Sequence, residues 1–316
     1  MTRRSWRSHI RAFLVAHVLL AASALAQAAM SGMPAPVAIA PGVYAFIGDN
    51  EAVAPANHGI VANNGFIVGP EGVTVIDTGS SYRYGRAMIE AIRKVTPLPI
   101  RLVIITHQAP EFVFGASAFR DDDVPILAHA RTAQLIHDRC SICLANLRKT
   151  LGEDEMAGSR VTVPDQTVNG TTEIDSGGRK LQLLHFGPAS TPGDLAVLDT
   201  QTGVLFAGGL VLNGRIPELR NEKIPGWLAA LEHLHALDLK TIVPGFGAPL
   251  HGGEGIMQTG EYLRELDASV KRAYKNGVGL TEAMHTVQVP AFRNYKLYSI
   301  AQPQNVQRIY LQLEKQ

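Results

Sequence analysis

Residues 101–107 read RLVIITH, a continuous apolar run that ends in a threonine and a histidine. A short run rich in Val and Ile predicts a strand that is covered on both faces. Residues 65–69 and 73–77 are two further strand-like runs, and the turn residues Pro-Glu-Gly between them predict a hairpin. The spacing of apolar residues over 84–95 predicts a helix before the 101–107 strand.

The same alternation of strands and helices continues to the end of the chain. Further strands are expected at 42–48, 180–186, 194–199, 203–207 and 241–243. Helices are expected at 130–151, 224–237, 255–276, 280–287 and 304–313. Strands come in groups with helices on both sides of each group. This order predicts two packed sheets with helices outside them.

Five short segments between these elements carry a family resemblance. They are VIDTG at 75–79, ITH at 105–107, TPGD at 191–194, LFAGGLV at 205–211 and IVPGFG at 242–247. In this order they resemble the turns and loops of the metallo-β-lactamase superfamily. The resemblance implies an α+β fold, an αββα sandwich of two central mixed β-sheets flanked by helices. The domain expected from the resemblance occupies 41–316, and the residues before it are interpreted as a signal peptide at 1–28 and a linker at 29–40.

A narrower resemblance rests on two other segments. Residues 60–69, IVANNGFIVG, and residues 226–231, GWLAAL, resemble the periplasmic zinc metallohydrolases of the quinoprotein relay system. That resemblance implies a place beside quinone-dependent dehydrogenases, and so a periplasmic protein of such a system as a partner.

The metal site implied by the superfamily is degenerate in this chain. The family's metal loop reads H-x-H-x-D-H, whereas residues 107–112 read HQAPEF. The resemblance assigns the former ligand positions to His107, Ala109, Glu111, Phe112, Ser190, Gly209 and Phe246. Catalytic zinc needs about three protein ligands and an open position, and neither metal of the pair keeps three. No cofactor is therefore expected, or at most one weakly bound metal at His107 and Glu111.

The loops that carry these positions are expected to line a cleft. Its predicted residues are Asp77, His107, Glu111, Phe112, Ser190, Gly209 and Phe246. Asp77 is expected to tie its loop down by accepting backbone N–H bonds. No residue is assigned a catalytic role, and the candidates for one are His107, Glu111 and Ser190. In that alternative the Ser190 hydroxyl attacks the substrate, His107 acts as the base and Glu111 orients the imidazole. The serine side chain is too short to reach His107 without a bridging water or a loop shift.

Cys140 and Cys143 form a C-x-x-C motif inside the expected helix 130–151. A local disulfide or two partly buried thiols is the structural interpretation. Thiol–disulfide exchange through the pair is the functional alternative.

The N-terminus predicts export. Four arginines in the first 11 residues precede an apolar run at 12–24, and small-x-small sites end at 26 and 28. This pattern is typical of a secretory signal peptide, by the Sec or the twin-arginine route, and predicts a periplasmic or secreted protein. No later segment is long and apolar enough to span a membrane. A net charge of +1, from 29 basic and 28 acidic residues, does not favour nucleic acid as a partner.

These observations together predict an exported, non-hydrolytic binding or accessory protein. Its ligand is a small molecule or a periplasmic protein. The alternatives are a residual hydrolase of esters, thioesters or lactams, dependent on a metal or on Ser190, and a thiol–disulfide function of Cys140 and Cys143.

Overall fold

Two mixed β-sheets form the centre of the computed structural model, which describes residues 33–220 and 223–315. The first sheet has the order β1 (Val37–Ala40), β2 (Val43–Phe46), β3 (Asn64–Val68), β4 (Val73–Ile76), β5 (Ile100–Ile105), β6 (Ile126–His129) and β7 (Gln166–Val168). Strands β1 to β4 pair antiparallel, and β4 to β7 pair parallel. The predicted signal peptide, 1–28, lies outside the described residues.

The second sheet runs in nearly reverse chain order. Its strands are β13 (Leu250–His251), β12 (Thr241–Val243), β11 (Val204–Phe206), β10 (Ala196–Asp199), β9 (Arg179–Leu184) and β8 (Thr172–Ser176). Only the β11–β12 pair among these is parallel. Each sheet therefore mixes both kinds of pairing, as the family resemblance implies.

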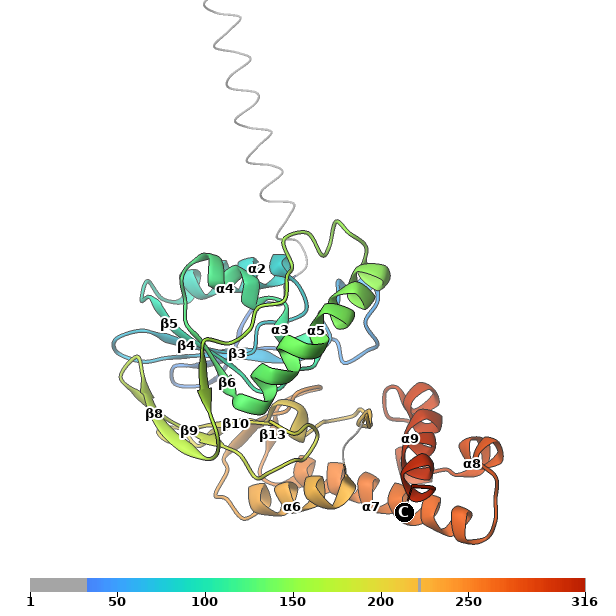
Figure 1. Cartoon of the computed structure of the whole chain (residues 1–316). Coiled ribbons are helices and arrows are strands. Elements are labelled where there is room, and N and C mark those ends of the chain that lie inside the picture. The colour runs from blue at the N-terminus through green and yellow to red at the C-terminus, as the bar shows by residue number, and fades with distance from the viewer. Residues whose placement is uncertain (1–32, 221–222, 316) are drawn as a thin grey trace, which may run out of the picture. The chain divides into compact units, whose positions relative to one another are not determined.

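Helices cover the outer face of each sheet (Figure 1). Helices α2 (Tyr82–Val95), α4 (Ala116–Asp121) and α5 (Ala130–Leu151) lie over the first sheet, and the short α3 (Pro110–Val113) precedes α4. Helices α6 (Ile224–His235) and α7 (Glu254–Lys275) lie over the second sheet, and α8 (Leu280–Thr286) and α9 (Tyr298–Leu313) pack with α7. Three 3-10 turns are η1 (Pro55–Asn57), η2 (Gly208–Leu210) and η3 (Pro290–Phe292). The predicted αββα sandwich is confirmed.

Strand β5 shows why the apolar run decides this fold. Leu102 and Ile104 join the buried cluster between the sheets, which also contains Leu181, Val197 and Phe206 of the second sheet. The alternate residues of β5, such as Val103, point to the helix side and are also buried. A strand covered on both faces must be apolar on both, as β5 is from Leu102 to Ile105, while Arg101 at its start is exposed.

Some elements differ from the sequence-based expectation. Strand β1 lies inside the segment 29–40, so the first sheet begins within the predicted linker. Strands β6, β7 and β8 were not predicted, because β6 is a short run and β7 and β8 carry many polar residues. Helix α9 begins at Tyr298, not at 304, although Pro303 lies inside it. Burial of Tyr298 and Ala301 holds the extra turn in place despite the proline.

No helix among the described residues is both long and apolar enough to cross a membrane.

A buried ion pair joins the two sheets near their edge. Arg179 at the start of β9 donates from Nε and Nη2 to the carboxylate of Asp199 at 2.8 and 2.7 Å. The same guanidinium also donates to the carbonyls of Val68 and Pro41 in the first sheet. Burial alone would raise the pKa of Asp199, but hydrogen bonds from Arg179 and Thr202 and the guanidinium charge hold it below its usual value. The carboxylate is therefore ionised at neutral pH, and its contribution to stability is lost only on acidification.

Replacing Arg179 by methionine should lower the free energy of unfolding by about 3–5 kcal/mol, because it leaves the buried carboxylate of Asp199 without its partner. Urea unfolding of the purified protein at pH 7 measures this. The matched control is Lys180→Met on the same strand, where the exposed pair with Glu173 at 3.7 Å is worth less than about 1 kcal/mol. Equal losses in both variants would contradict a special role for the Arg179 pair.

Candidate functional site

The candidate site begins where strands β4 and β5 end side by side. Asp77 follows β4 in the left-handed conformation, with φ of 57°, and its N–H donates to the carbonyl of Ile104 at 2.8 Å. Its carboxyl accepts hydrogen bonds from the backbone N–H of Thr106 at 2.8 Å and from the Thr106 hydroxyl at 2.7 Å. These contacts tie the two strand ends together and set the direction of the loop that follows Thr106.

His107 is the next residue and is 4% exposed. Its Nδ1 lies 3.1 Å from the Thr106 hydroxyl, so a chain of hydrogen-bonding groups runs from Asp77 through Thr106 to His107. Burial lowers the pKa of His107 to about 3, and the positive charge of Arg220 acts in the same direction. Burial raises the pKa of Asp77 to about 8, which the two bonds from Thr106 only partly offset. The imidazole is therefore neutral at physiological pH.

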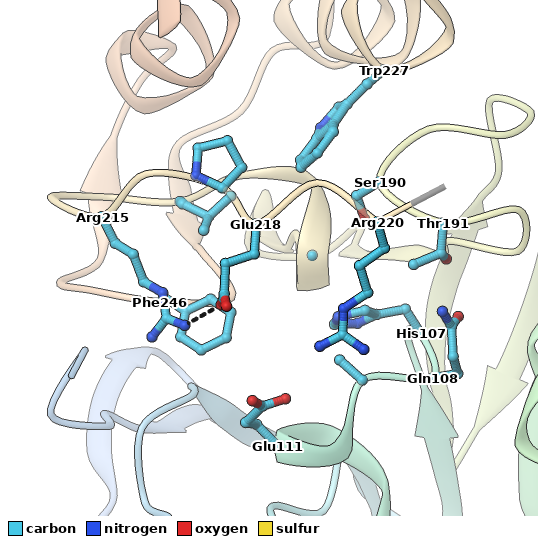
Figure 2. A pocket seen from close by; sticks show the side chains of 14 residues that line it. His107, Gln108, Glu111, Ser190, Thr191, Arg215, Glu218, Arg220, Trp227 and Phe246 are labelled. Atoms are coloured by element: carbon cyan, nitrogen blue, oxygen red, sulfur yellow. Dashed lines mark hydrogen bonds and ion pairs between the residues drawn. The ribbon is translucent and has the colours of Figure 1, made fainter. Parts of the chain in front are cut away.

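Two phenylalanine rings pack beside this histidine. The ring of Phe112 lies 4.2 Å from the His107 ring, and Phe246 meets Phe112 edge to face at 5.5 Å between centroids. The guanidinium carbon of Arg215 lies 4.0 Å above the centroid of Phe246, in a cation–π contact. Arg215 is 4% exposed and is held by Glu218 at 2.7 Å, as Figure 2 shows.

Ser190 does not bond to His107 in this arrangement. Its hydroxyl donates to Oδ1 of Asp194 at 3.0 Å, and the same carboxylate accepts from the N–H and hydroxyl of Thr191 at 2.6 Å each. A Cβ atom on Gly209 would lie 2.8 Å from the Ser190 hydroxyl and 2.9 Å from Nε2 of His107. These approaches are too close for a side chain, so the packing around residue 209 requires glycine.

A small pocket of about 70 Å³ opens beside these groups (Figure 2). The residues that line it are His107, Gln108, Ala109, Glu111, Ser190, Thr191, Gly209, Leu212, Arg215, Pro217, Glu218, Arg220, Trp227 and Phe246. The pocket thus brings together five residues of the predicted cleft. Asp77 and Phe112 do not line it, because both are buried behind it as supports.

Some lining residues come from the segment 212–220 and from α6, and the sequence did not predict them. Arg215, Glu218, Arg220 and Trp227 belong to no motif of the resemblance, and no spacing pattern marks them. These residues reach the pocket because the chain after η2 passes the end of β5, where His107 lies. This approach could not be inferred from local sequence.

A comparison with protein-family models matches residues 59–245 to the metallo-beta-lactamase superfamily. The chain belongs to this superfamily. It is 24% identical over 261 residues to a linear primary-alkylsulfatase of Pseudomonas sp. (strain ATCC 19151), a match that covers 71% of this chain and 49% of that protein. The chain thus spans about half the length of this curated relative.

Two solved structures show the same fold. A metallo-beta-lactamase from Pontibacter korlensis superposes with a TM-score of 0.59 at 21% identity, over 72% of this chain and 98% of that one. A stereoselective inverting sec-alkylsulfatase from Pseudomonas sp. superposes with a TM-score of 0.66 at 17% identity, over 88% of this chain and 50% of that one.

The zinc ions of the superfamily do not fit the residues present here. Among the described residues, no group of three or more His, Cys, Asp or Glu side chains lies close enough to hold a metal ion. His107 is the one imidazole at the former ligand positions, where phenylalanines 112 and 246 and Gly209 offer no donor.

Cys140 and Cys143 are free thiols on α5, one buried and one partly exposed, which is the second of the two structural alternatives. One turn of a regular helix holds side chains at this spacing about 5–6 Å apart at Cβ, beyond the roughly 3.5–4.5 Å of an unstrained disulfide.

Asp77→Asn should change how stability depends on pH. The folded pKa of Asp77 lies above its value in the unfolded chain, so the wild-type protein loses stability as pH rises toward about 8, whereas asparagine does not titrate. Between pH 5 and 8 the difference in unfolding free energy should shift by a few kcal/mol in favour of the variant. Urea unfolding curves at half-unit pH steps measure it. Parallel pH profiles for the two proteins would refute the raised pKa.

Proposed function

We propose that this chain binds a small organic anion in the pocket beside His107 and does not hydrolyse it. The observation that carries the proposal is the replacement of metal ligands by packed aromatic rings. Phe112 and Phe246 contact each other and His107, and Arg215 covers Phe246. Without a metal ion, a bound water keeps a pKa near 15.7 and supplies no hydroxide at neutral pH.

The ligand class is inferred from the charges and apolar groups on the pocket walls. Arg215 pairs with Glu218 on one wall, and Arg220 is exposed and reaches toward His107 in Figure 2. Leu212 and Trp227 provide an apolar side for a short hydrocarbon part. The relatives named alkylsulfatases supply a candidate chemistry, a sulfate monoester, whose anionic end Arg220 would hold.

A Ser190-dependent hydrolase is the second candidate function. It is supported by the positions of Ser190 and His107. The Oγ atom of Ser190 and the Nε2 atom of His107 both lie within 3 Å of the point where a Cβ atom on residue 209 would be. Against it, the Ser190 hydroxyl already donates to Asp194, and Nδ1 of His107 faces a threonine and not a carboxylate. Glu111 makes no hydrogen bond to His107 within the described part of the chain. An activated nucleophile needs a base within hydrogen-bond reach, so binding is the better-supported function.

Export and a partner remain part of the proposal. The N-terminal signal pattern supports a periplasmic or secreted location, and the quinoprotein-relay resemblance supports an accessory role near a periplasmic dehydrogenase. The fold alone does not determine the activity, since one fold hosts many functions.

Protein purified from the periplasm without added metal or chelator should hold zinc, iron and manganese far below one atom per chain. Incubation with zinc followed by gel filtration should not raise that ratio, because fewer than three ligands are available. Elemental mass spectrometry measures the content, with His107→Ala as the control. Near-stoichiometric metal that His107→Ala abolishes would overturn the non-hydrolytic assignment and revive a metal-dependent hydrolase.

Binding can be followed through Trp227, because the chain has two tryptophans and the other is Trp6. In a protein with Trp6→Phe, a short-chain alkyl sulfate should change the fluorescence of Trp227, and the ester should be recovered intact. Arg220→Gln should weaken binding about tenfold, the loss of one charged hydrogen bond. Glu111→Gln should tighten it, since it removes a negative charge from the opposite wall.

The control for these variants is Arg264→Gln, because Arg264 is an exposed arginine of α7 outside the pocket. Equal affinity in the Arg220 and Arg264 variants would show that the anion binds elsewhere. Recovery of inorganic sulfate, lost in Ser190→Ala, would favour the hydrolase.

A further inference from the structure

The two cysteines of α5 form a second chemical site that the proposed function does not use. Cys140 is fully buried, and Cys143 is partly exposed three residues later on the same helix face. The side chain of Ile142 between them is 67% exposed, so the surface at Cys143 is open to another molecule. The pair therefore combines one accessible thiol with one protected thiol.

The surroundings of the pair favour a thiolate on Cys143. A hydrogen bond from the Cys140 thiol lowers the pKa of Cys143 to about 6, and the positive charge of Arg220 acts in the same direction against burial and Glu111. The same contact, together with burial, raises the pKa of Cys140. The Cys143 thiol donates to the carbonyl of Arg139 at 3.6 Å, and of the two thiols it is the exposed one that loses its proton first.

The position of Cys140 suits a second, resolving role. Its side chain is fully buried, and its thiol donates to the carbonyl oxygen of Gln108, a residue that lines the pocket, at 3.8 Å. One helical turn separates the two side chains, and a disulfide between them must distort that turn. A strained disulfide is readily reduced, which is a property of exchanging and not of structural bonds.

We propose that Cys143 and Cys140 form a thiol–disulfide exchange site for a low-molecular-weight disulfide such as oxidised glutathione. The Cys143 thiolate attacks one sulfur of the disulfide, forms a mixed disulfide and releases one thiolate. Cys140 then loses its proton and attacks the Cys143 sulfur, and the second thiolate leaves. The product is a Cys140–Cys143 disulfide; the protein gives up two electrons, and the small disulfide becomes two thiols.

The test uses purified, reduced protein and mass spectrometry of the modified peptides. Iodoacetamide should label Cys143 before Cys140, with half-maximal rate near pH 6. Oxidised glutathione should leave a stable adduct on Cys143 in Cys140→Ser, no adduct in Cys143→Ser, and an internal disulfide in the wild type. Millimolar reduced glutathione should reverse that disulfide.

Two arginine variants test whether the charge of Arg220 lowers the pKa of Cys143. Arg220→Gln should raise the pH of half-maximal labelling, whereas Arg139→Gln on the exposed face of the same helix should not. Labelling of Cys143 only near the ordinary thiol pKa of about 8.5 would overturn the proposal. So would the absence of a glutathione adduct in Cys140→Ser, or an internal disulfide that resists reduced glutathione.

Discussion

The hydrogen bonds between Asp77 and Thr106 are the constraint on which the site depends. Asp77 leaves β4 with positive φ and holds both the backbone and the hydroxyl of the residue that ends β5. Because neighbouring parallel strands end at the same edge of a sheet, this clamp fixes where His107 and the following loop begin. Asp77 lies beneath the pocket and does not line it. Its hydrogen bonds to Thr106 hold the shape of the site without a contribution from the residues at 107–112.

Side-chain contacts join the loops that line the pocket. Here the His107, Phe112 and Phe246 rings join the same loops by contact, and Arg215 ties them to Glu218 and to the carbonyl of Glu51. Gly209 completes this arrangement, since a side chain there would collide with Ser190 and His107. The degenerate positions thus form a packed structure and not a set of vacancies.

Arg220 links the pocket with the thiol pair. Its charge lowers the pKa of His107 on one side and that of Cys143 on the other. Glu111 acts on Cys143 in the opposite direction. One arginine therefore influences both the anion-binding and the thiol chemistry proposed here, and an anion bound at Arg220 would weaken its effect on Cys143.

The sequence by itself determined the αββα class and the residue types at the positions that the resemblance assigns to metal ligands. The apolar run 101–106 predicts burial on both faces, and ligand identity at 107–112, 190, 209 and 246 can be read residue by residue once the motifs are placed in order. It did not determine strands β1 and β6 to β8, whose runs are short or polar. Only the tertiary structure brought Arg215, Arg220 and Trp227 to the pocket and withdrew Asp77 and Phe112 from it. These placements depend on contacts between residues far apart in the chain, such as the approach of segment 212–220 to the ends of β4 and β5. A local sequence pattern does not predict such contacts.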